Sequence, residues 1–100
     1  MGSNSKNIFA SKEYHLLYWL SNHQLQTVSG MIVKFSQAEL AEEYGCSLAT
    51  VNKLITDLRK ANCIVSKKRG CYKITNIGCT VIDKMNEIEK AIGGQYNGKN

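Results

Sequence analysis

The sequence of 100 residues contains no proline, a single tryptophan and no long uninterrupted run of apolar residues. A helix needs about 20 consecutive, mostly apolar residues to cross a bilayer, so a membrane-spanning helix is excluded. The first six residues, Met-Gly-Ser-Asn-Ser-Lys, lack the apolar core of a signal peptide. Lys6 stands where a myristoylation site requires serine or threonine. These absences predict a cytoplasmic protein that makes no contact with a membrane.

The sequence also lacks the paired ligands of metal sites and the paired groups of catalytic sites. The two histidines, His15 and His23, lie far from the cysteines, none of which has the Cys-x-x-Cys spacing common in zinc sites. The cysteines are Cys46, Cys63, Cys71 and Cys79. We expect free thiols that pack as small apolar side chains, and neither a metal nor another cofactor. No carboxylate pair and no nucleophile with an adjacent base is recognisable, so we expect a protein that is not an enzyme.

The most informative segment, from Gln37 to Leu54, predicts two short helices joined by a tight turn. Gly45 allows the positive φ of such a turn, Ala41 is small where the helices approach, and Ser47 is suited to cap the second helix. An apolar stripe at helical spacing follows, formed by Leu48, Val51, Leu54, Ile55 and Leu58. The segment resembles the helix-turn-helix of DNA-binding proteins, whose second helix lies in the major groove. An ordinary helical hairpin in a small α-helical core is the alternative.

Positive charge is concentrated around this motif. From residue 45 to residue 75 seven side chains are basic and only Asp57 is acidic, a net charge of +6, whereas the rest of the chain sums to −1. Such a distribution predicts a polyanionic partner. A merely solvated basic face is the alternative, but it would not explain why the excess charge coincides with the motif.

A helix and a strand are predicted before the motif. The first helix spans 11–22, with Ser11 as its N-cap. The polar segment 24–30 is expected to be irregular, and the alternation over 31–35 favours a short strand.

Capping and turn residues define the elements that follow. Ser36 and Glu39 form a capping box at the start of the second helix, and the third helix spans 47–61. Two β-rich stretches flank Lys68-Arg69-Gly70, which predicts a hairpin over 64–74.

The last helix is predicted over 76–92 and is expected to end at Gly93-Gly94. The chain then consists of a flexible N-terminus (1–10), one domain (11–92) and a flexible tail (93–100). The fold class is mainly α with a small β-hairpin, in the order helix, strand, helix, helix, hairpin, helix.

A helix-turn-helix followed directly by a basic hairpin resembles the winged-helix DNA-binding family. The order of elements is similar to that of small bacterial regulators such as those of the MarR and ArsR families. This resemblance implies that the hairpin 64–74 is a wing, which contacts the minor groove or the DNA backbone beside the recognition helix.

The first and last helices are predicted to form a homodimer. The helix 11–22 is apolar on nearly all sides, which is typical of a helix buried on several faces. A partner subunit would bury one of these faces. In the helix 76–92 a narrow apolar stripe resembles a coiled-coil contact and consists of Ile77, Val81, Met85, Ile88 and Ile92. Packing of this stripe on the chain's own core is the alternative.

Candidate DNA contacts follow from the helical wheel of 47–61, with Val51 facing the core. The candidates are Ser36, Gln37, Ser47, Ala49, Thr50, Asn52, Lys53, Thr56, Lys60, Lys67, Lys68 and Arg69. Asn52 is suited to adenine, Lys53 to guanine, and Ala49 or the Thr50 methyl group to the methyl group of thymine. The others are better suited to phosphates, with Arg69 also suited to a narrow minor groove. No arginine is expected on the reading face of this helix.

Three functions remain open at this stage. The first is a sequence-specific, dimeric transcriptional regulator that acts by occluding a promoter. The second is DNA handling on a plasmid or mobile element, at a partition centromere, a replication origin or a transfer origin. The third is a winged helix that binds only proteins. The sequence does not reveal the target site, an effector ligand or a redox role for the cysteines.

Overall fold

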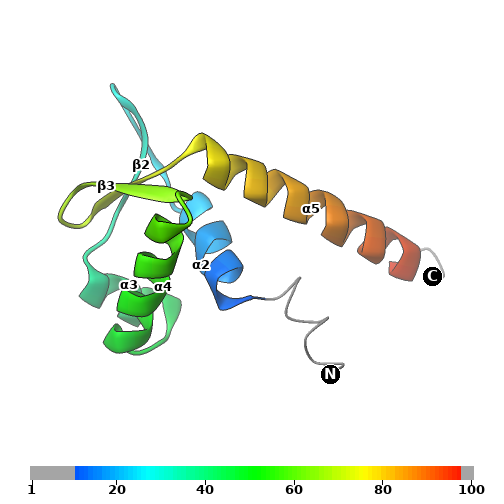
Figure 1. Ribbon diagram of the computed structural model, residues 1–100, viewed down its shortest axis with the longest axis horizontal. Helices are drawn as coiled ribbons and strands as arrows, with labels where there is room; N and C mark the ends of the chain where they lie inside the picture. The colour runs from blue at the N-terminus through cyan, green and yellow to red at the C-terminus, as the bar shows by residue number, and fades with distance from the viewer. Residues whose placement is uncertain (1–10, 98–100) are drawn as a thin grey trace.

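The computed structural model describes the backbone of residues 11–97 and the side chains of residues 11–91. The chain forms helices and one small antiparallel sheet, in agreement with the predicted fold class (Figure 1). The elements are α2 (Lys12–Ser21), β1 (Leu25–Thr27), β2 (Gly30–Lys34), α3 (Gln37–Tyr44), α4 (Leu48–Lys60), β3 (Ile64–Lys68), β4 (Cys71–Ile74) and α5 (Asn76–Asn97).

Serine side chains begin three of the helices, as predicted. Ser11 Oγ accepts a hydrogen bond from the backbone N–H of Tyr14 at 3.0 Å. The capping box at α3 is complete, because Ser36 Oγ accepts from the N–H of Glu39 at 3.0 Å and the Glu39 carboxylate accepts from the N–H of Ser36 at 2.8 Å. Ser47 Oγ accepts from the N–H of Thr50 at 3.1 Å. These bonds satisfy amide groups that a helix start leaves without partners.

The sheet has four strands, in the order β1-β2-β4-β3, and all neighbours are antiparallel. The prediction that residues 24–30 are irregular is wrong, because Leu25–Thr27 pairs with Gly30–Ile32 of the next strand. This strand escaped prediction because it is short and lies at the sheet edge with largely exposed side chains, so it shows no buried–exposed alternation. The pairing of Lys34 with Cys71 brings the wing, residues 64–74, beside the start of α3.

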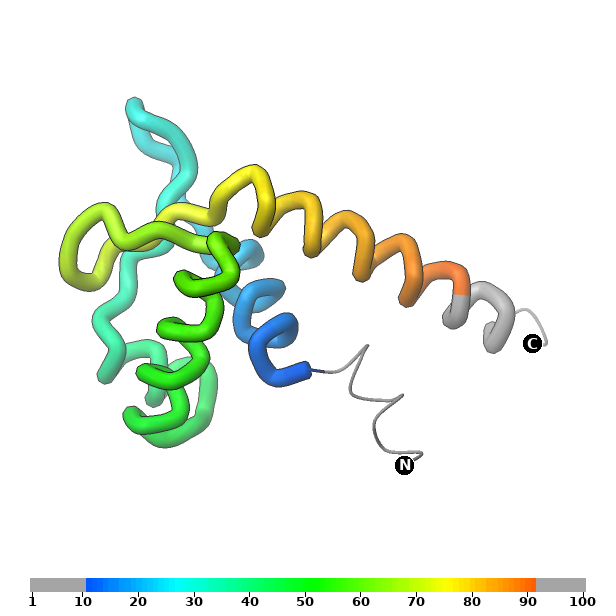
Figure 2. The backbone as a smooth tube through the Cα atoms, in the orientation of Figure 1, coloured from blue at the N-terminus to red at the C-terminus, as the bar shows by residue number. Residues whose placement is uncertain are grey.

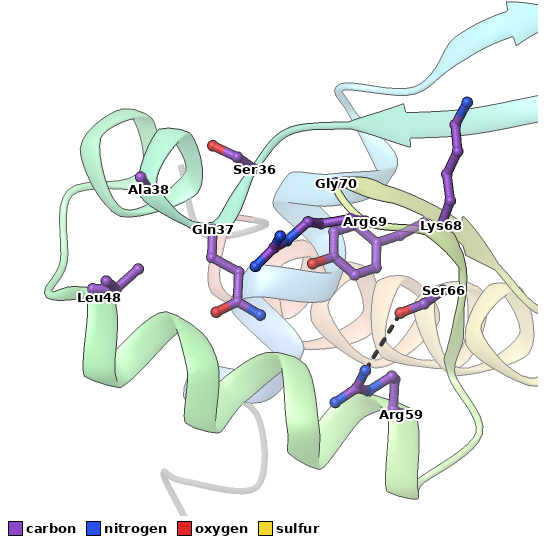
Figure 3. A pocket seen from close by; sticks show the side chains of 10 residues that line it. Ser36, Gln37, Ala38, Leu48, Arg59, Ser66, Lys68, Arg69 and Gly70 are labelled. Carbon is purple, nitrogen blue, oxygen red and sulfur yellow. Dashed lines mark hydrogen bonds between the residues drawn. The ribbon is translucent and has the colours of Figure 1, made fainter.

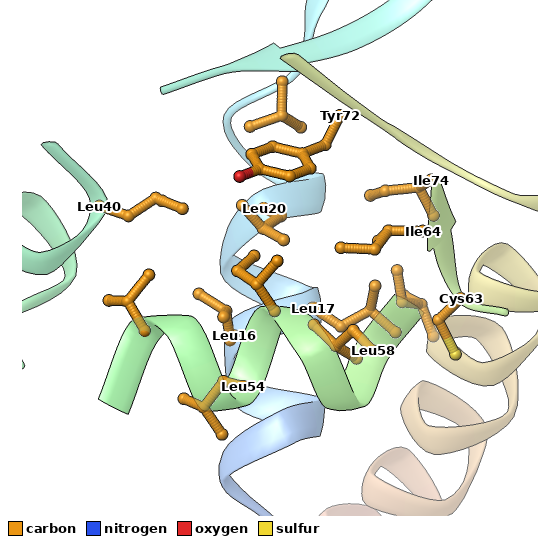
Figure 4. Packing of buried hydrophobic residues seen from close by; sticks show 14 residues of the cluster. Leu16, Leu17, Leu20, Leu40, Leu54, Leu58, Cys63, Ile64, Tyr72 and Ile74 are labelled. Carbon is orange, nitrogen blue, oxygen red and sulfur yellow. The ribbon is translucent and has the colours of Figure 1, made fainter. Parts of the chain in front are cut away.

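The core lies between α2, α4 and the inner face of the sheet (Figure 4). Leu16, Leu17 and Leu20 of α2 are buried against Val51 and Ile55 of α4 and their neighbours. The chain's own core therefore covers most of the apolar surface of α2, and burial of this helix does not require a partner. Among its large apolar residues only Tyr18, 42% exposed, faces solvent substantially.

The last helix, α5, extends away from α3 and α4 (Figure 2). It contacts α2, where the Tyr14 hydroxyl donates to Asn86 Oδ1 at 3.5 Å. It continues to Asn97, so the prediction that Gly93-Gly94 ends it is wrong. Glycine weakens a helix by about 1 kcal/mol relative to alanine but does not forbid it, and no proline follows to stop it. Ile82 packs into the core, whereas Ile77 and Ile88 are exposed.

At Gly78, α5 packs closely against the rest of the chain. A Cβ atom at this position would overlap the carbonyl oxygen of Cys63 and lie 2.7 Å from Cγ2 of Ile74. The first turn of α5 thus packs directly on the backbone that joins α4 to β3, and only glycine leaves room for this contact.

We expect Gly78→Ala to lower the free energy of unfolding by about 1–3 kcal/mol, the usual cost of overpacking. At an unhindered helix position the same change would stabilise the protein. Urea unfolding followed by circular dichroism measures the effect, with Cys79→Ala, an exposed neighbour, as the control that should change stability by less than about 0.5 kcal/mol. An unchanged or higher stability of Gly78→Ala would contradict this packing.

Candidate nucleic-acid interface

The turn between α3 and α4 has the geometry that the sequence predicts. Gly45 has a φ of 87°, in the left-handed region, and ends α3. The N–H groups of Gly45 and Cys46 both donate to the carbonyl oxygen of Ala41, at 3.0 and 2.9 Å. Ala41 and Cys46 also pack against the core. The turn therefore fixes the direction in which α4 leaves α3.

Helix α4 has a buried face and an exposed face. Val51, Leu54, Ile55 and Leu58 are buried. Of the side chains expected to point away from the core, Ala49, Lys53 and Lys60 are exposed and Thr56 is half-buried; of the two expected on the flanks, Asn52 is exposed and Thr50 is half-buried. We call this side of α4 the reading face.

The predicted place of Leu48 on the apolar stripe of α4 is wrong. The sequence places it on the apolar stripe with Val51, but its side chain is 55% exposed. The Leu48 side chain lies beside Gln37 and Ala38 at the start of α3 and not in the core, so helical spacing alone assigned it to the wrong surface (Figure 3).

An open groove of about 810 Å³ lies between the start of α3, the wing and α4, to which α4 contributes Leu48 and Arg59 (Figure 3). Its lining residues come from separate parts of the chain and are Ser36, Gln37, Ala38, Leu48, Arg59, Ser66, Lys68, Arg69, Gly70 and Tyr72. Three of them are cationic, and no acidic residue is among them. The fold thus brings together four of the predicted site residues, namely Ser36, Gln37, Lys68 and Arg69.

Other predicted site residues lie outside this lining but close to it in the fold. Ser47, Ala49, Thr50, Asn52, Lys53, Thr56 and Lys60 belong to α4 or its cap, and Lys67 is an exposed residue of the wing. The hydroxyl groups of Ser47 and Thr50 bond to each other at 2.9 Å, which occupies part of their hydrogen-bonding capacity.

Arg59 is a groove residue that the sequence analysis missed. It lines the groove, and its Nη1 donates to Ser66 Oγ at 3.4 Å, which connects α4 to β3. Arg59 thus adds an arginine of α4 to the groove, outside the set of residues predicted to contact DNA. The sequence does indicate the face of α4 on which Arg59 lies. Arg59 follows Asn52 by seven residues, which places both on nearly the same face of a helix.

Lys53 and Asp57 form an ion pair along the exposed surface of α4. Lys53 Nζ donates to Asp57 Oδ2 at 2.9 Å. This hydrogen bond raises the pKa of Lys53 and lowers the pKa of Asp57. Both groups therefore stay charged near neutral pH, and the only acid of the segment 45–75 engages a lysine predicted to contact bases.

Neither a metal centre nor a membrane span is recognisable in the described part of the chain. Across residues 11–91 no three His, Cys, Asp or Glu side chains are grouped so that they could hold a metal ion. None of the helices in the described segment is long and apolar enough to span a bilayer.

The order of helices, the turn at Gly45 and the hairpin beside α4 define a winged helix-turn-helix protein. Residues 14–78 match the model of the Crp-like helix-turn-helix domain. Since this match spans more than half of the sequence, the chain belongs to the Crp-like helix-turn-helix family. The winged helix-turn-helix prediction is thereby confirmed, although the match does not specifically support a MarR-like or ArsR-like protein.

A solved structure, the reduced (FeII) CO-sensing protein from R. rubrum, has a similar fold. The TM-score is 0.61 at 22% sequence identity, over 83% of this chain and 39% of that one. The chain therefore spans about two fifths of that protein, and at this identity the likeness shows the fold alone. The comparison with curated proteins gave no match.

Proposed function

We propose that this protein is a cytoplasmic, sequence-specific regulator of transcription that binds double-stranded DNA. The observation that supports this most strongly is the exposed reading face of α4 beside a groove lined by Arg59, Lys68 and Arg69. A cationic surface next to an exposed helix in a Crp-like helix-turn-helix domain suits a duplex better than a neutral ligand.

In this proposal the elements have separate tasks. The first turns of α4 enter the major groove, where Ala49, Asn52 and Lys53 meet base edges. Ser36 and Gln37, at the start of α3, bond to a phosphate of the same strand or its neighbour. The wing contacts the backbone or the minor groove on one side of this helix.

Repression by occlusion of a promoter is the simplest mechanism for such a domain. Handling of plasmid or mobile-element DNA would use the same interface and differs in where the sites lie. Footprinting on native DNA distinguishes them, because a regulator occupies an operator near a promoter and the other role requires clustered repeats at an origin.

Substitution of the wing cations tests the DNA contact. We expect the variant with Lys67→Ala, Lys68→Ala and Arg69→Ala to bind all duplexes more weakly, because these side chains contact the backbone or the minor groove and not base edges in the major groove. For the wild type, a dimer with about 8 phosphate contacts should show a log–log dependence of affinity on salt with a slope near −7. The variant's slope should be less negative by about 0.9 for each phosphate that it no longer neutralises.

The matched control removes three lysines of α2 and α5 instead, by Lys12→Ala, Lys84→Ala and Lys90→Ala. It has the same net charge as the wing variant and should keep the wild-type slope. Affinity that does not depend on salt, or equal losses of affinity in both triple variants, would count against the wing contact.

The apolar stripe of α5 supports a homodimer as a further part of the proposal. Ile77 is 52% exposed and Ile88 is 37% exposed, while Val81 and Met85 are half-buried. The single chain thus leaves much of this stripe uncovered, and a second α5 would cover it. A dimer would place two recognition helices on half-sites about one helical turn apart.

A charge in the stripe should break this dimer. We expect Ile88→Glu to sediment as a monomer at concentrations where the wild type is dimeric, because two buried carboxylates would face each other. Cys79→Glu puts the same charge on another exposed face of α5 and should remain a dimer. A wild type that is monomeric at all concentrations, or a dimeric Ile88→Glu, would refute this interface.

A further inference from the structure

Leu48 occupies an unusual place for an exposed leucine. It is the first residue of α4, its side chain is 55% exposed, and it lines the groove beside Gln37 and Ala38. Single exposed leucines are common on protein surfaces and need no explanation by themselves. The start of a recognition helix, however, is the part that approaches base edges most closely.

The polar side chains around Leu48 are partly engaged within the protein. Ser47 Oγ accepts from the N–H of Thr50 and donates to Thr50 Oγ1, at 3.1 and 2.9 Å. Lys53 Nζ is bound to Asp57 at 2.9 Å. The first turn of α4 therefore exposes two apolar groups that are not engaged in hydrogen bonds. They are the Leu48 side chain and the methyl group of Ala49.

We propose that Leu48 is a specificity-determining residue that contacts the C5 methyl group of thymine, so that the target contains an A·T pair at the matching position. This inference rests on the proposed function. Thymine is the only standard base with a methyl group in the major groove, and apolar side chains recognise it by direct contact.

The neighbouring Asn52 fits the same preference. Its side chain is exposed one turn further along α4, and its Oδ1 accepts from Thr56 Oγ1 at 3.4 Å, which restrains the amide orientation. An amide held in this way suits adenine, whose N7 accepts and whose N6 amino group donates in the major groove. Leu48 and Asn52 together favour A·T-containing sites over guanine-rich ones.

The test begins with selection of bound duplexes by the full chain from a pool with a random central sequence. The selected duplex is then resynthesised with deoxyuridine in place of one thymidine at a time, because uracil pairs like thymine but lacks the methyl group. We expect at least one position where the exchange weakens binding about fourfold, since burial of one such group is worth about 0.8 kcal/mol.

Two variants make the comparison specific. Leu48→Ala should bind the thymidine duplex about as weakly as the wild type binds the deoxyuridine duplex, and should be insensitive to the exchange. Leu25→Ala is the matched control, because Leu25 is 53% exposed but lies on β1, and it should behave like the wild type.

The outcomes separate the inference from the function on which it rests. Tight binding that is insensitive to uracil at every position, or a Leu48→Ala variant as sensitive as the wild type, overturns the role of Leu48 and leaves DNA binding intact. Selected duplexes that share no A·T pair would also overturn the role of Leu48 and leave DNA binding intact. If the protein retains no duplex from the pool, the proposed function fails, and the inference fails with it.

Discussion

The burial of one face of α4 is the interaction on which the rest of the structure depends. Val51 and Ile55 have no exposed surface, and they pack against the equally buried Leu16 and Leu20 of α2. Full burial of such side chains contributes about 1.5–3 kcal/mol each, so the rotation of α4 about its axis is strongly fixed. Once this face is buried, the opposite face is necessarily presented to solvent beside the wing.

The backbone segments next to α4 determine which elements lie beside its exposed face. The turn at Gly45 directs the start of α4, and the pairing of β2 with β4 holds the wing next to the start of α3. The groove is formed by these two constraints together, and its cations come from α4 and the wing. Three of the seven basic residues from residue 45 to residue 75, namely Arg59, Lys68 and Arg69, are thus brought together in one groove.

Much of this arrangement could be predicted because its signals are local. A serine before an amphipathic helix and a glycine between two helices impose their geometry on a few neighbouring residues, so Ser36, Gly45 and Ser47 were assigned correctly. The strand β1 left no such signal, because backbone pairing alone forms it. Helical spacing identifies directions around an axis but not the neighbours that lie there, which is why it groups Leu48 with the buried residues of the apolar stripe. Helical spacing places Arg59 on nearly the same face of α4 as Asn52, but its bond to Ser66 depends on the approach of α4 to β3, a tertiary contact that spacing does not encode.

The central claim is that the reading face of α4 and the wing meet a DNA duplex. Nuclear magnetic resonance of the isotope-labelled protein, titrated with a mixed-sequence duplex, tests this most directly because each backbone amide reports on its own surroundings. We expect the amide signals of residues 48–60 and of the turn at Arg69-Gly70 to shift most, while those of residues 25–31 stay in place. Shifts confined to α5 or to the β1–β2 hairpin, with the signals of α4 unchanged, would contradict the central claim.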